Sequence, residues 1–85
     1  MEQIKYVIKD NAGIHARPAG LLVKLAKEFE SSITIEKDGK TADARKILAV
    51  MSLGAKKDDE ITVKIDGNDA ESAANKIKEF LENNL

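Results

Sequence analysis

One stretch near the start of the chain combines residues that are suited to phosphoryl chemistry. The only histidine, His15, is followed by Arg17 and then by Pro18, the only proline. A neutral imidazole is a nucleophile near pH 7, and a guanidinium pairs well with phosphate oxygens. The stretch therefore predicts a histidine that accepts and holds a phosphoryl group.

The pattern around His15 predicts that it lies where a helix begins. Residues 4–9 alternate in the manner of a strand, whereas apolar residues recur every three or four positions from Ala16 onward. Pro18 suits the first helical turn, where its missing N–H costs nothing. Because the first N–H groups of a helix lack partners and the dipole is positive there, this position favours an anion.

Each of these residues also has an ordinary structural explanation. A single histidine in a small domain is most often a surface residue or a core residue with satisfied hydrogen bonds, and most arginines are solvated. Gly13 supplies a positive φ, and Pro18 starts a helix. The functional interpretation is favoured because His15 lies off the apolar stripe and close to Arg17.

Length and composition predict one domain and argue against several other classes. The chain has 85 residues and a net charge of −1, which argues against a general nucleic-acid binder. It has no cysteine, and one histidine alone does not make the usual metal site. No signal peptide or membrane-spanning run is visible. We expect a single domain, residues 1–85, in the cytoplasm.

The remaining periodicity predicts the element order β-α-β-β-α-β-α. Asp38-Gly39 is a strong hairpin signal, and Asn68 or Asp69 is suited to cap the last helix. An antiparallel sheet with its helices on one face, an α+β fold, is the simplest arrangement. Strands are expected near residues 4–9, 33–36, 40–43 and 61–65, and helices near 16–29, 47–53 and 70–83.

The helix expected over residues 47–53 is apolar on two sides. Ile47, Leu48 and Met51 fall on one arc, while Val50 and Leu53 fall on another. A small domain easily buries one side of a surface helix but hardly both. The segment is therefore either fully buried or an exposed apolar surface that docks a protein.

Two charged stretches are open to more than one interpretation. Arg45 and Lys46 precede this helix, where cations oppose the helix dipole. They serve either solubility or the steering of an acidic partner. The run over residues 56–60 is expected to be a solvated loop.

The run Gly13–Ala19, Gly-Ile-His-Ala-Arg-Pro-Ala, resembles the histidine-containing phosphocarrier (HPr) family of the bacterial phosphoenolpyruvate:sugar phosphotransferase system. The resemblance covers the whole chain, including the hairpin, the run Val50–Gly54, and the final strand and helix. It implies an open-faced β-sandwich, in which a four-stranded antiparallel sheet carries three helices on one side.

The resemblance also implies a function for the site. His15 would receive a phosphoryl group on Nδ1 from the phosphohistidine of enzyme I and pass it to a IIA domain of a sugar permease. Arg17 would stabilise the phosphate, together with the backbone N–H groups of Ala16 and Arg17. Such a protein is a carrier rather than an enzyme and holds no cofactor, because phosphoenolpyruvate and Mg²⁺ are used by enzyme I.

The residues with which the family binds its partner proteins also have counterparts in this sequence. Ile47, Leu48 and Met51 match its exposed docking patch, and Gly20 falls at another contact position. Enzyme I, IIA domains and transcriptional regulators are the expected partners of a monomer that binds no nucleic acid and enters no membrane. A regulatory relative that docks on transcription factors without feeding sugar uptake is the main alternative.

One position departs from the family pattern. In HPr of low-GC Gram-positive bacteria, the corresponding residue is a serine that an ATP-dependent kinase phosphorylates to signal carbon status. Here that position is Lys46, whether by nature or by engineering. A lysine has no hydroxyl to phosphorylate, and its charge is opposite to that of phosphoserine. We therefore predict that the serine-linked regulation is absent.

Overall fold

The computed structural model describes residues 1–85 and contains the seven elements in the predicted order. The strands are β1 (Glu2–Val7), β2 (Ser32–Lys37), β3 (Lys40–Asp43) and β4 (Glu60–Asp66). The helices are α1 (Ala16–Ala26), α2 (Ile47–Ser52) and α3 (Ala70–Asn84).

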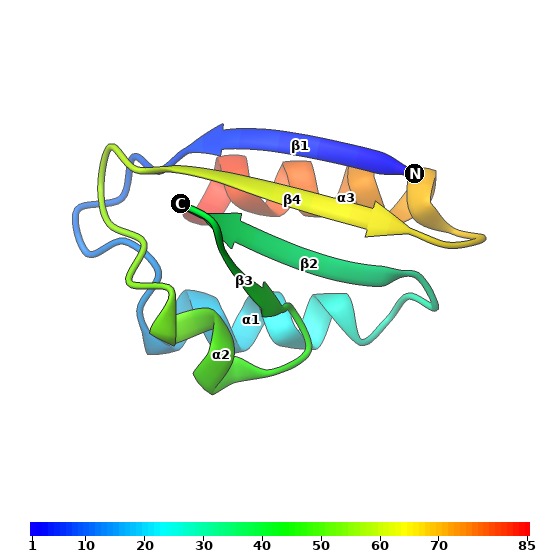
Figure 1. Cartoon of the computed structure of the whole chain (residues 1–85), viewed down its shortest axis with the longest axis horizontal. Coiled ribbons are helices and arrows are strands. Elements are labelled where there is room, and N and C mark those ends of the chain that lie inside the picture. The colour runs from blue at the N-terminus through cyan, green and yellow to red at the C-terminus, as the bar shows by residue number, and fades with distance from the viewer.

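The strands form one antiparallel sheet in the order β1-β4-β2-β3. Figure 1 shows α1 and α3 side by side behind this sheet, with the short α2 next to α1 and close to β3. The other face of the sheet is left open. The predicted open-faced α+β architecture is therefore confirmed.

The hairpin between β2 and β3 shows how local sequence sets this topology. Asp38 and Gly39 both adopt left-handed conformations, with φ of 51° and 82°. Two such residues in succession make the turn whose twist matches that of the flanking strands. The hairpin closes with Lys37 opposite Lys40, as the Asp-Gly signal predicts.

The core lies between the sheet and the helices and fixes the position of α1. Alternate residues of β2 and β4 are buried, as the period of a half-buried strand requires. Ala19, Leu22 and Ala26 of α1 are almost completely buried on the facing side. The start of α1 is thus held by packing on a rigid sheet. The buried strand residues are Ile33, Ile35, Ile61, Val63 and Ile65.

The predicted capping of α3 by a side chain is wrong. Asp69 occupies the N-cap position, yet its carboxylate makes no capping hydrogen bond to α3. Instead it accepts hydrogen bonds from Glu30 N and Ser31 N, each at 2.9 Å, and from the Ser31 hydroxyl. The Ser31 hydroxyl, followed by the Glu30 N–H, lowers the pKa of Asp69. Because Ser31 is buried, its N–H needs a protein acceptor, and Asp69 provides it.

Arg45 is a structural residue rather than a free surface cation. Its guanidinium donates hydrogen bonds to the carbonyl of Phe29 and, at 3.0 Å, to that of Ser31. These bonds tie the segment before α2 to the connection between α1 and β2. Solubility and steering therefore do not explain this arginine.

The expectation of a simple solvated loop over residues 56–60 is only partly right. Its backbone exchanges two hydrogen bonds with Ile8, at 2.9 and 2.8 Å. Asp59 accepts a hydrogen bond from Lys56 N at 2.8 Å and lies 3.2 Å from Lys37 Nζ. The Lys56 N–H, and then the Lys37 ammonium, lower the pKa of Asp59. The loop is therefore fixed against the end of β1.

Candidate functional site

His15 lies immediately before α1 in an extended conformation. Its carbonyl accepts the Ala19 N–H at 2.9 Å, which begins the hydrogen-bond ladder of the helix. The imidazole makes no capping hydrogen bond, and 48% of the side chain is exposed. The ring is thus held at a helix start while staying accessible to another molecule.

The first turn of α1 is arranged to receive an anion. The N–H groups of Ala16 and Arg17 have no acceptor in the protein, and Pro18 has no N–H. No acidic residue lies in this turn. Because free amides and the positive helix end coincide here, a phosphoryl group beside His15 would meet donors without rearrangement.

His15 and Arg17 line one open hollow of about 250 Å³. Pro18, Leu21 and Asn84 complete its lining, so the hollow lies between the start of α1 and the end of α3. Leu21 and Asn84 were not among the residues predicted from sequence. Leu21 carries a signal, since it is apolar but lies off the buried stripe of α1, whereas nothing in the sequence marks Asn84.

The loop before His15 needs a glycine. Gly13 has a φ of +66°, and a side chain there would place its Cβ 2.8 Å from the Cα of Lys56. The neighbouring Ile14 N–H donates to the carbonyl of Ala55 at 3.0 Å. The loop that follows α2 therefore packs directly against the loop that carries His15.

The end of the chain also supports this loop. The N–H groups of Lys9 and Asp10 donate to the Leu85 main-chain oxygen at 2.6 and 2.8 Å. Figure 1 shows the red end of α3 at the same end of the molecule as the blue loop after β1. Asp10 lies 4.0 Å from His15, measured from Oδ2 to Nε2. Sequence reasoning missed this carboxylate, because no local spacing rule links a turn residue to a histidine five positions later.

The two apolar arcs of α2 have different surroundings. Val50 and Leu53 are buried, whereas Ile47 and Leu48 are 39% and 78% exposed. Met51 is partly buried and packs against the core. Ile47 and Leu48 make up what we call the apolar patch, whereas the exposed Leu21 of α1 belongs to the hollow beside His15.

The remaining predicted residues lie around this patch. Gly20 belongs to the contact between α1 and α2, because a Cβ built there would lie 3.6 Å from Ile47 Cδ1. Lys46 occupies the N-cap position of α2, with an exposed side chain that makes no capping bond. The structure thus brings Gly20, Ile47 and Leu48 to the α1–α2 side of the molecule.

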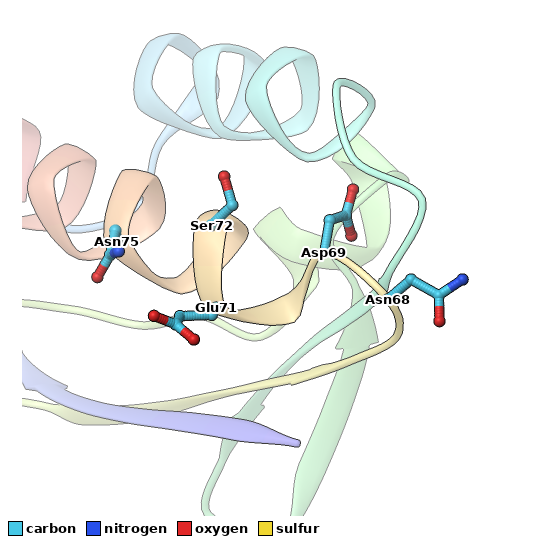
Figure 2. A pocket seen from close by; sticks show the side chains of 5 residues that line it. All are labelled: Asn68, Asp69, Glu71, Ser72 and Asn75. Carbon is cyan, nitrogen blue, oxygen red and sulfur yellow. The ribbon is translucent and has the colours of Figure 1, made fainter.

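A second hollow, at the start of α3, does not gather a set of converging side chains. Figure 2 shows Asp69 turned toward the connection between α1 and β2, while Asn68 and Glu71 point in other directions. Ser72 and Asn75 also diverge from one another. No cluster of three metal-ligating side chains occurs in the structure, and none of its helices has the length and apolar character to cross a membrane.

Comparison with known proteins gives consistent matches. The family model described as "PTS HPr component phosphorylation site" matches residues 2–83. Phosphocarrier protein HPr of Mycoplasma pneumoniae is 42% identical over 83 residues, which cover 96% of this chain and 94% of that protein. The solved histidine-containing phosphocarrier protein of a Mycoplasma superposes with a TM-score of 0.90 at 40% identity, covering 93% of this chain and 90% of that one. A solved HPr dimer from Thermoanaerobacter tengcongensis gives a TM-score of 0.77 at 36% identity, covering 98% and 95%.

Proposed function

This chain belongs to the HPr family of phosphocarrier proteins, and on that premise we propose that it carries a phosphoryl group on Nδ1 of His15. Family membership makes it a carrier of the phosphotransferase system rather than an enzyme. In our proposal, the group comes from the phosphohistidine of enzyme I and goes to a histidine on the IIA domain of a sugar permease.

The proposal rests on one observation above all: His15 and Arg17 line the same hollow where α1 begins with two unpaired N–H groups. In the transfer, the Nδ1 lone pair attacks phosphorus. The new N–P bond forms as the donor's N–P bond breaks, and its electron pair returns to the donor imidazole. The Arg17 guanidinium and the backbone N–H groups of Ala16 and Arg17 stabilise the negative charge on the phosphoryl oxygens.

The exposure of the site suits exchange with two proteins. The imidazole is half exposed and lies in an open hollow, so donor and acceptor histidines can each approach it. We propose that the chain itself needs no cofactor, since phosphoenolpyruvate and Mg²⁺ act at enzyme I. On the same reasoning the chain works in the cytoplasm, where it would meet enzyme I.

We propose that the apolar patch docks both partners. Leu48 is the most exposed apolar side chain of α2, and burying it against a partner would remove apolar area from water. The carrier would act as a monomer, although an HPr dimer is among the similar structures. Sedimentation equilibrium is expected to give the mass of one chain, and a dimer at micromolar concentration would contradict this part of the proposal.

We further propose that Lys46 removes the serine-linked regulation known from the family. The side chain is exposed at the N-cap of α2, the position that a kinase would have to modify. Purified HPr kinase with ATP is expected to leave this protein unlabelled, whereas Lys46→Ser serves as the variant that restores a hydroxyl. Stoichiometric labelling of the unaltered chain would contradict the proposal.

Phosphorylation by enzyme I tests the function itself. The chain is incubated with enzyme I, Mg²⁺ and labelled phosphoenolpyruvate, in parallel with His15→Ala. We expect one phosphoryl group per chain, absent from the variant. Since His15 is the only histidine, any acid-labile phosphohistidine must be at this residue. Equal labelling of the two proteins would refute the assignment.

A further inference from the structure

We propose that Asp10 is a positioning residue for the phosphoryl acceptor, because the charge of its carboxylate favours the ring proton of His15 on Nε2 and leaves the lone pair on Nδ1. This inference rests on the proposed function of His15 and adds a residue to that site. It concerns the tautomer of the imidazole, which decides which ring nitrogen is nucleophilic.

The position of Asp10 is set by the loop that carries it. Its N–H donates to the Leu85 main-chain oxygen at 2.8 Å, and its Oδ2 accepts the Ala12 N–H at 2.9 Å. The same oxygen lies 4.0 Å from Nε2 of His15, so the carboxylate faces the nitrogen that does not take the phosphoryl group in our proposal. Asp10 is not among the residues that line the hollow, and besides His15 the only titratable residue that lines it is Arg17, a cation.

The chemistry follows from the charge of the carboxylate. At 4.0 Å the Asp10 oxygen lies beyond direct hydrogen-bond distance of Nε2, so it acts through its charge. A neutral imidazole has one N–H, and a negative charge beside Nε2 favours the tautomer that places this N–H there. When Nδ1 attacks phosphorus, the His15 ring gains positive charge while keeping the Nε2 proton. The negative charge of Asp10 stabilises this positive charge. The donor's N–P bond breaks in the same step, and its electron pair returns to the donor ring.

The expected effect is modest. Both side chains are partly exposed, at 48% and 40%, so water screens their interaction. Exposed ion pairs correspond to an effect of up to about five-fold on an equilibrium or a rate. Loss of the Asp10 charge should therefore slow phosphoryl uptake by up to about this factor, because the ring gains positive charge in the transfer. The fraction of the Nε2–H tautomer should fall by a smaller factor, because the neutral ring carries only partial charges.

The test compares the full-length protein with Asp10→Asn and a matched control, Asp43→Asn. The asparagine of the first variant keeps an oxygen that can accept the Ala12 N–H while removing the charge. Asp43 makes the same type of bond, to Arg45 N at 2.9 Å, at the end of the strand on the opposite sheet edge. Nitrogen-15 NMR of the His15 ring gives the tautomer ratio. Labelling by enzyme I and phosphoenolpyruvate, quenched at successive times, gives the uptake rate.

We expect Asp10→Asn to shift the tautomer ratio and slow uptake, while Asp43→Asn changes neither. An unchanged tautomer ratio in Asp10→Asn would overturn the inference, even if uptake slowed, because a loop displacement would then explain the rate. If the unaltered chain takes no phosphoryl group, the proposed function fails. The NMR measurement still decides whether Asp10 sets the tautomer.

Discussion

Replacing Leu48 with alanine should weaken docking without weakening the fold. The substitution removes three carbon atoms, each worth about 0.8 kcal/mol when fully buried. Because 78% of Leu48 is exposed in the free protein, most of this energy is still available to a partner. The loss on binding is therefore about 2 kcal/mol, or roughly 25-fold in the Kd for enzyme I or a IIA domain.

Val50→Ala provides the matched control, since Val50 lies on the same helix but is fully buried. Removing its two methyl groups should cost about 2–3 kcal/mol of unfolding free energy, because a cavity is added to the lost burial. For a domain of this size, that corresponds to a fall in Tm of roughly 10–20 °C. Leu48→Ala should shift the Tm by less than about 4 °C.

Two assays on both variants separate these effects. Thermal unfolding followed by circular dichroism reports stability, and the KM of enzyme I for the carrier, measured well below either Tm, reports docking. We expect Leu48→Ala to raise the KM and Val50→Ala to lower the Tm. A Leu48→Ala protein that melts as early as Val50→Ala, or that keeps the original KM, would refute the assignment of the two arcs of α2.

Three further predictions concern the site and its supports. The pKa of Asp69 in the folded protein is lowered from its ordinary value of 3.8. The ionised carboxylate therefore stabilises the fold fully at a pH above 3.8, and this stabilisation is lost as the pH falls through the lower pKa of the folded state. Urea unfolding between pH 6 and pH 2 should therefore show a steeper acid loss for the unaltered chain than for Asp69→Asn, and equal slopes would contradict this. Gly13→Ala should cost at least about 1–2 kcal/mol, because a left-handed alanine is strained and its Cβ meets the Lys56 backbone; an unchanged Tm would rule this out. Arg17→Lys should slow phosphoryl uptake by about ten-fold, since an ammonium lacks the planar pair of donors, and uptake at the original rate would show that charge alone suffices.

Local patterns predict the elements because each is encoded within a few residues. The alternation of Ile61, Val63 and Ile65 marks β4, and Asp38-Gly39 marks the hairpin, without reference to the rest of the chain. The position of His15 at the start of α1 follows in the same way from a change of period and from a proline in the first turn.

Contacts between distant segments could not be predicted from such patterns. The position of Asp69 just before α3 predicts a helix cap, but its carboxylate makes no capping hydrogen bond. It accepts the N–H of Ser31 instead, 38 residues earlier in the chain, and no local pattern indicates this contact. Arg45 likewise bonds carbonyls of the connection before β2, while its local setting indicates only an exposed cation. Asp10 comes near His15 because the intervening loop is fixed by Leu85 and Ala55.

The most direct test of the central claim is whether the phosphoryl group moves on. The phosphorylated chain is separated from enzyme I and phosphoenolpyruvate, and is then mixed with a purified IIA domain. His15→Ala, taken through the same separation, controls for label carried over with enzyme I. A carrier is expected to lose its label from His15 as the IIA domain gains an equal amount. Label that stays on His15 in the presence of every IIA domain tried would contradict the carrier function and favour the regulatory alternative.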